Sequence, residues 1–143
     1  MQAISIGHAG ILIRTRGITI VCDPWFEPAF FASWFVFPRN DRLDLAPFLT
    51  PDYLYISHLH HDHFDPAWLA AHVDKGTQVL LPAFRIDNLE RELRALGFER
   101  IIHTDHAERS ALTSSDPSVA STAAASRASS SPTRMYTVAA LMK

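Results

Sequence analysis

The stretch Ile56-Ser57-His58-Leu59-His60-His61-Asp62-His63 carries the strongest structural and chemical signal in this chain of 143 residues. It overlaps the end of an apolar run, 53–57, which is predicted to be a strand. Asp65-Pro66 follows, an aspartate and proline pair typical of the first turn of a helix. Four of the eight histidines of the chain therefore fall at a predicted junction between a strand and a helix.

The spacing of these side chains predicts a metal site. Residues two apart in an extended segment point the same way, so His58 and His60 are predicted to converge on one cation. The chain must then turn into the helix, which directs Asp62 and His63 toward a neighbouring point. Imidazole and carboxylate ligands suit zinc, iron or manganese, and the lack of thiolates argues against a structural zinc finger. His61 occupies a variable position, and a solvated polar loop is the alternative interpretation of the whole stretch.

The elements around the histidines predict an α/β fold. Short β-branched runs indicate a meander of three strands, and the remaining segments alternate between strand and helix. The predicted strands are 3–6, 10–14, 18–22, 53–57, 78–81 and 98–103, and the predicted helices are 66–73, ending by Gly76, and 86–96, ending at Gly97. The sequence thus predicts a sheet with helices packed against it.

Residues 23–38 hold three prolines and seven large aromatic side chains, which predicts a long loop. We expect its aromatic residues to pack into the core, the alternative being a wall of a substrate pocket. Asp23 is expected to orient a ligand histidine, the alternative being a turn former. For His8 two interpretations stay open, a group beside the metal pocket or a turn histidine bonded to backbone. Cys22 is expected to be a small buried residue.

Composition divides the chain near residue 110. Residues 1–110 are predicted to form one domain, whereas 111–143 contain eight alanines, eight serines and four threonines and are predicted to be disordered, with 135–138 as a weak strand candidate. Residues 1–110 also hold 14 of the 15 acidic and 10 of the 13 basic residues, which argues against nucleic acid as a partner. One cysteine, no signal sequence and no long apolar run predict a cytoplasmic protein without a membrane span.

Three motifs resemble the metallo-β-lactamase superfamily in order and spacing, namely Ile6-Gly7-His8-Ala9-Gly10, Asp23-Pro24-Trp25 and residues 56–63. The resemblance is greatest to the branch of L-ascorbate-6-phosphate lactonase-like hydrolases and N-acyl-phosphatidylethanolamine phospholipase D. Residues 23–34 are also similar to the start of CMP-N-acetylneuraminate hydroxylase-like proteins, which share that fold. Covering about residues 1–106, the resemblance implies the N-terminal half of an αββα sandwich.

The resemblance also implies a hydrolytic centre with one or two divalent metal ions, zinc before manganese or iron. It implies that His58 and His60 bind the first metal and that Asp62 and His63 bind the second. Asp62 is then the catalytic residue that takes a proton from the bridging water. The implied reaction is the cleavage of a small-molecule ester, lactone or phosphodiester with metal-activated hydroxide.

Complete members of the superfamily add a second half that supplies a histidine, a bridging aspartate and a final histidine. Residues 111–143 contain no histidine and one aspartate, Asp116. We therefore expect a truncated hydrolase, with an inactive fragment or a subunit completed by another chain as alternatives. A partner chain or a second copy is expected to cover the apolar sheet face left open by the missing half. His103 and His106 could replace missing ligands, although a surface turn is the preferred interpretation.

Overall fold

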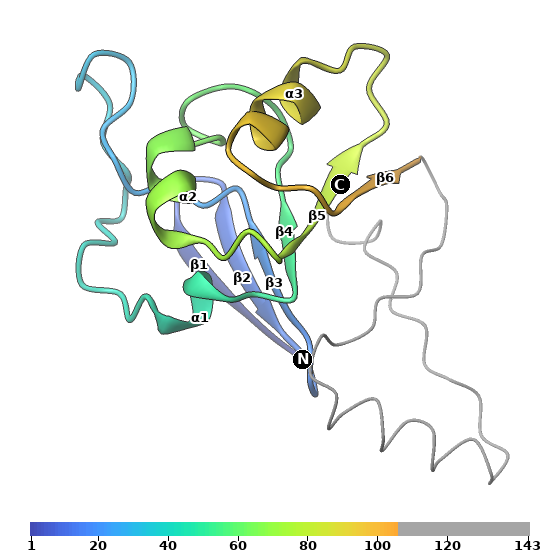
Figure 1. The fold of residues 1–143 in the computed structure, drawn as a ribbon. Coiled ribbons are helices and arrows are strands. Elements are labelled where there is room, and N and C mark those ends of the chain that lie inside the picture. The colour runs from blue at the N-terminus through green and yellow to red at the C-terminus, as the bar shows by residue number, and fades with distance from the viewer. Residues whose placement is uncertain (106–143) are drawn as a thin grey trace, which may run out of the picture.

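The computed structural model describes residues 1–105 and contains a six-stranded sheet with helices packed against it (Figure 1). The order of the strands in the sheet is their order in the chain: β1 (Gln2–Gly7), β2 (Gly10–Arg14), β3 (Thr19–Cys22), β4 (Tyr53–Tyr55), β5 (Gln78–Pro82) and β6 (Ile101–Thr104). Strands β1, β2 and β3 pair antiparallel, whereas β3, β4, β5 and β6 pair parallel. The predicted α/β fold, with a meander followed by alternating elements, is confirmed.

The described residues form three helices, α1 (Ala46–Leu49), α2 (Pro66–His72) and α3 (Asn88–Ala95). The side chain of Asp65 accepts a hydrogen bond from the backbone N–H of Trp68 at 3.1 Å, so the predicted cap begins α2. Helix α2 ends at His72, ahead of the predicted stop at Gly76. Gly97 follows α3 with a φ of 95°, a left-handed conformation that suits the predicted glycine stop. Helix α1 is a single turn that was not predicted.

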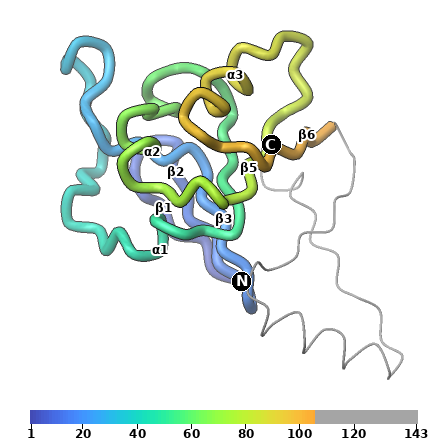
Figure 2. The backbone as a smooth tube through the Cα atoms, viewed as in Figure 1, coloured from blue at the N-terminus to red at the C-terminus, as the bar shows by residue number. Residues whose placement is uncertain are grey.

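The main core lies between one face of the sheet and the helices. Leu54 and Val79 on the sheet, Leu69 on α2 and Leu93 on α3 are 0% exposed and belong to one cluster. Figures 1 and 2 show α2 in front of β1 and β2, in agreement with this packing. Burying a leucine side chain contributes about 1.5–3 kcal/mol, so this face fixes the sheet that carries the histidine motif.

A second apolar cluster lies on the other face of the sheet. It is formed by strand residues that alternate with those of the main core. Its buried members are drawn from β2 to β5 and from the loop before β3: Ile13, Ile18, Ile20, Cys22, Tyr53, Tyr55 and Leu80. They are at most 9% exposed. Cover of this face by a partner chain or a second copy stays a prediction. No helix of the described residues contributes to this cluster. Within residues 1–105, no helix has the length and apolar character needed to cross a bilayer.

The loop after β3 departs from its predicted packing. It forms no regular strand or helix through residue 38, as the prolines predict, apart from one bridge between Ala29 and Trp34. Trp25 is 2% exposed, but Phe31 is fully exposed. The expectation of core packing is also wrong for three further residues, Phe30, Trp34 and Phe35, which are exposed. Phe37 of the same loop is exposed as well. Backbone N–H groups at the start of the loop donate hydrogen bonds to the Asp65 side chain, and the middle of the loop projects away from the sheet (Figure 1).

Candidate metal centre

The topology of the sheet brings three distant segments to one edge. Because β1, β3 and β4 run in the same direction, their carboxyl ends lie side by side, and Gly7, Cys22 and Tyr55 mark that edge. The residues that follow these ends are His8, Asp23 and the stretch 56–63. Ligands of α/β proteins bind at the carboxyl ends of parallel strands. The fold therefore places the histidine motif, and two polar residues far from it in sequence, at one position.

The buried carboxylate of Asp23 accepts hydrogen bonds from two residues of the motif. Its Oδ1 accepts a hydrogen bond from the backbone N–H of Ser57 at 2.7 Å. Its Oδ2 accepts one from the Ser57 hydroxyl at 2.6 Å and one from His63 Nδ1 at 3.0 Å. Asp23 is 6% exposed and has a φ of 41°. The side chain thus contacts a motif histidine as predicted, while the ligand role of that histidine remains a prediction.

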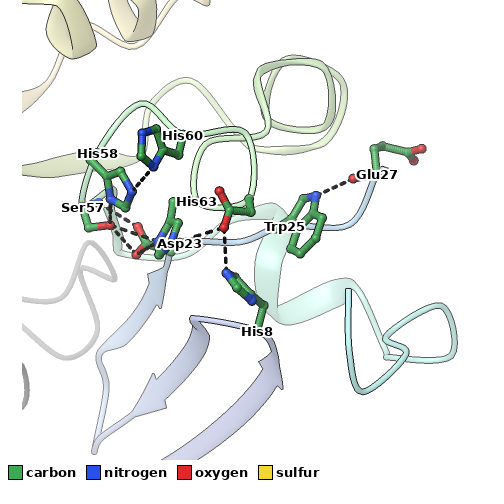
Figure 3. A network of polar contacts seen from close by, with 9 residues as sticks. His8, Asp23, Trp25, Glu27, Ser57, His58, His60 and His63 are labelled. Atoms are coloured by element: carbon green, nitrogen blue, oxygen red, sulfur yellow. Dashed lines mark hydrogen bonds and ion pairs between the residues drawn. The ribbon is translucent and has the colours of Figure 1, made fainter. Parts of the chain in front are cut away.

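The two histidines of the predicted first metal face each other. His58 Nε2 lies 3.1 Å from His60 Nδ1 (Figure 3). Two imidazole nitrogens that bind one tetrahedral zinc at about 2.1 Å are separated by roughly 3.4 Å, so the observed spacing fits a shared cation. His58 Nδ1 lies 2.8 Å from Ser57 Oγ, whose proton is donated to Asp23. The network therefore places the His58 proton on Nδ1 and leaves Nε2 unprotonated, as the acceptor in its contact with His60 Nδ1.

Asp62 and His63 lie beside this pair. The rings of His58 and His63 are 4.1 Å apart between centroids, and His63 Nε2 is 3.8 Å from Asp62 Oδ2. His8 Nε2 donates a hydrogen bond to the same Asp62 oxygen at 2.9 Å. Ligand atoms of His8, Asp62 and His63 all lie within 4.8 Å of one another, which is close enough for a metal ion. The donor set of the site therefore fits a divalent cation.

Burial and neighbouring charges favour the protonation states that metal ligands require. Burial of the ring, together with the adjacent His63 and His60, lowers the pKa of His58. Burial alone would raise the pKa of Asp62, but its own backbone N–H and the nearby His63 and His8 outweigh burial and lower it. A neutral imidazole and an ionised carboxylate are the forms that bind metals. The pKa shifts of these two side chains therefore favour the binding of a cation.

The remaining histidines of the described chain lie apart from this cluster. His61 is exposed, and its ring stacks near Phe30 with centroids 5.7 Å apart. His103 on β6 pairs with Glu90 at 2.9 Å, which fits the preferred surface interpretation. His106 lies outside the described residues, as do the predicted disordered stretch 111–143 and its strand candidate. His8 forms a hydrogen bond with the side chain of Asp62, which favours the first of its two interpretations, a group beside the metal pocket.

The antiparallel meander could have predicted that His8 lies at the same edge of the sheet as the motif. Two reversals between β1 and β3 return the end of β1 to the same edge as the end of β3. A hollow of about 390 Å³ lies nearby, lined by the start and end of the aromatic loop: Phe26, Pro28, Phe35, Val36, Arg39, Asn40 and Asp41. Asn40 connects it to the site, because its amide donates to the backbone oxygen of Trp25, whose ring contacts His8.

Comparison with protein families matches residues 4–129 to the beta-lactamase superfamily domain. The chain belongs to this superfamily. Among curated relatives, a "Putative Rieske 2Fe-2S iron-sulfur protein" of Mycobacterium tuberculosis is 55% identical over 104 residues, and one of Mycolicibacterium smegmatis is 53% identical. The match covers 73% of this chain but 20% of each relative. This superfamily member therefore spans about a fifth of the length of those proteins.

Solved structures show the same fold in enzymes. CmlA, a diiron β-hydroxylase from Streptomyces venezuelae, is 26% identical with a TM-score of 0.56, over 76% of this chain and 21% of CmlA. An isothiocyanate hydrolase from Delia radicum gut bacteria is 18% identical with a TM-score of 0.57, over 73% of this chain and 42% of the hydrolase. The second likeness concerns the fold alone. The predicted fold, that of the N-terminal part of a metallo-β-lactamase domain, is thereby confirmed.

The Rieske cluster in the name of the mycobacterial relatives does not fit this chain. A Rieske centre is held by two cysteines and two histidines. The chain has one cysteine, Cys22, which is 4% exposed on β3. Burial raises the pKa of its thiol to about 12, whereas a cysteine that binds iron does so as a thiolate. The superfamily member thus lacks the donors for that cluster.

Proposed function

We propose that this chain supplies the metal-binding residues of a metal-dependent hydrolase that cleaves an ester, a lactone or a phosphodiester. The observation that carries the proposal is the 3.1 Å separation of His58 Nε2 and His60 Nδ1 beside Asp62 and His63. A divalent cation at such a site lowers the pKa of water and polarises the bond to be cleaved. Zinc suits these ligands, and we place the chain in the lactonase-like branch of the superfamily on its motifs.

The side chains of the chain take separate parts in this proposal. His58 and His60 hold one cation, and Asp62 and His63 hold the other. Asp62 accepts the proton of the attacking water; its lowered pKa keeps the carboxylate ionised and so able to accept, and its exposure is low. Asp23 and Ser57 keep the ligand nitrogens of His58 and His63 free of protons. The hollow beside the aromatic loop is linked to this site through Asn40 and Trp25 and is the proposed location of the substrate's apolar part.

Replacing single histidines tests the proposal with a control inside the motif. We expect His58→Ala and His60→Ala each to lose the cation that this pair holds, measured by elemental analysis after dialysis, because each removes one of two facing nitrogens. We expect His61→Ala to leave metal content unchanged, since His61 stacks near Phe30 away from the cluster. Turnover of a p-nitrophenyl ester, a thiolactone and bis-p-nitrophenyl phosphate should follow metal content. Full metal uptake by His60→Ala would reject the proposed site.

An incomplete site is the alternative, because the later ligands of complete superfamily members lie beyond residues 1–105. In that case another chain, or another part of a longer protein, completes the centre. The chain alone would then bind metal without turning over any of the three substrates. Hydrolysis that depends on His58 and His60 in the 143-residue chain would exclude this alternative.

A second candidate function is oxygen-dependent hydroxylation at two iron ions. The 26% identity to CmlA, a diiron β-hydroxylase, favours it. Metal competition separates the two candidates, because imidazole and carboxylate ligands accept both iron and zinc. The chain is loaded with Fe(II) or with Zn(II) in the absence of oxygen. Hydrolysis and, once oxygen is admitted, oxygen consumption are then measured. Hydrolysis with zinc supports the hydrolase, whereas oxygen consumption by the iron-loaded chain, without hydrolysis under either metal, supports the hydroxylase.

A further inference from the structure

His8 occupies an unusual backbone conformation at the turn between β1 and β2. Its φ is 49°, a left-handed value that persists in a residue other than glycine only where the surroundings hold it. Its backbone N–H donates to the oxygen of Phe37 at 2.9 Å. A Cβ at Gly7 would lie 2.6 Å from Val36, so the absence of a side chain there lets the loop pass close. The turn is thus held against the end of the aromatic loop.

The ring of His8 is aimed at the metal centre. It meets the ring of Trp25 edge-on, with centroids 5.2 Å apart, and that of His63 edge-on at 5.4 Å. Its Nε2 reaches Asp62 Oδ2 at 2.9 Å across 54 positions of sequence. A turn alone would be served by glycine or asparagine, which adopt left-handed conformations more readily. The side chain of His8 therefore has a role beyond the turn.

We propose that His8 is a positioning residue that fixes the carboxylate of Asp62 beside His63. The hydrogen bond occupies one lone pair of Oδ2 and sets the rotation of the carboxylate, whose remaining lone pairs then face a cation. Asp62 is 8% exposed, so few other donors can reach it in the part of the chain that the structure describes. This inference rests on the proposed metal binding by Asp62 and His63.

Two substitutions separate the side chain of His8 from its backbone. His8→Asn keeps a residue that tolerates the left-handed conformation, but its side chain is too short to reach Asp62. His8→Gln places an amide N–H near the position of Nε2. In the full chain, titration with Co(II) followed by absorption and by a competing chelator gives the stoichiometry and both affinities. We expect His8→Asn to weaken the second cobalt ion about 10–100-fold, as loss of partners of metal ligands does elsewhere.

The glutamine variant should recover most of that affinity, and the metal-free unfolding temperatures of the two variants should agree. Unchanged cobalt binding by His8→Asn would overturn the proposal. Loss of one cobalt ion in both variants would also overturn it, because His8 would then be a ligand itself.

A metal-free measurement keeps the inference separate from the proposed function. Nitrogen NMR of the imidazoles in the metal-free chain should show the His8 proton on Nε2, with a resonance that shifts in Asp62→Ala. If the unaltered chain binds no metal, the proposed function fails and this spectrum alone decides the contact. A His8 resonance that does not respond to Asp62→Ala would overturn the assignment.

Discussion

At the residue scale, the carboxylate of Asp23 sets the hydrogen-bonding state of two histidines at once. Because Ser57 donates its proton to Asp23, its oxygen can only accept from His58 Nδ1. His63 Nδ1 donates to Asp23 directly. Both rings therefore present Nε2 without a proton, the form in which imidazole binds metals. One buried aspartate thus prepares two ligands that belong to different predicted metal ions.

Replacing this carboxylate should weaken metal binding more than folding. Asp23→Asn keeps a residue that tolerates the φ of 41°, but its amide nitrogen cannot accept from Ser57 and His63. We expect metal affinity to fall about 10–100-fold, measured by competition with a chromogenic chelator. Asp41→Asn, at an exposed aspartate paired with Arg39, is the matched control and should bind as before. Equal affinity in the two variants would contradict the role of Asp23.

The thiol of Cys22 should be unreactive in the folded chain. Burial, followed by the charge of Asp23, raises its pKa to about 12 from 9.0. We expect iodoacetamide to label the folded chain at least about 100-fold more slowly than the urea-unfolded chain at mildly alkaline pH. The folded pKa lies above the unfolded one, so the thiol's contribution to stability is present below pH 9 and is lost as the pH rises toward 12. Equal labelling rates would show that Cys22 is accessible.

The motif residues could be predicted from sequence because their spacing along one strand end is local. His8 could not be assigned, because its contact with Asp62 spans 54 positions and depends on how β1 and β3 align. Asp23 lay between these cases. Its place after a strand indicated the correct edge of the sheet, but its two hydrogen-bonding partners required the fold.

At the element scale, the N-terminus of α2 joins the helix to the aromatic loop. Asp65 Oδ1 accepts from Trp68 N–H, and Oδ2 accepts from the backbone N–H groups of Phe26 and Glu27 at 3.3 and 2.9 Å. Phe26 then stacks on Trp68, with centroids 4.2 Å apart. This carboxylate holds the helix directly after the metal motif and also holds the start of the loop.

Asp65→Ala should therefore destabilise the chain and release the loop. Three backbone N–H groups lose their acceptor, and Asp65 is 6% exposed, so water replaces it poorly. We expect the free energy of unfolding to fall by about 2 kcal/mol or more, measured by urea denaturation. Asp44→Ala is the control, since exposed Asp44 accepts one such bond, from Ala46 N–H at 3.1 Å. Equal losses in the two variants would contradict the joining role.

The strands and the two longer helices were predictable because alternation, capping residues and glycine stops are local signals. Helix α1 was missed because a single turn of four residues carries no periodicity. The aromatic loop was misjudged for a different reason. Hydrophobic composition indicates burial, but Phe30, Phe31 and Ala32 all adopt left-handed conformations in a segment that projects from the sheet, which leaves the first two side chains exposed.

At the scale of the whole molecule, the chain brings its candidate metal-binding residues to one edge of one sheet. Four side chains of the motif, with His8 and Asp23, come from the ends of β1, β3 and β4. The mycobacterial relatives, 55% and 53% identical, are matched over only 20% of their length and carry a Rieske protein name. Resemblance to them concerns this sheet, and the chemistry named for the whole relatives needs donors that this chain does not have.

The single cysteine makes that difference testable. After anaerobic reconstitution with iron and sulfide, we expect the 143-residue chain to hold iron without acid-labile sulfide and without the electron paramagnetic resonance signal of a reduced Rieske centre. A [2Fe–2S] Rieske cluster needs two thiolates on one iron, and the one thiol here is buried and protonated. The iron held by the imidazole pair should be lost in His60→Ala and should persist in His61→Ala, because imidazole rather than sulfur holds it. Stoichiometric sulfide that is lost in Cys22→Ser would contradict this assignment and would make Cys22 a cluster ligand.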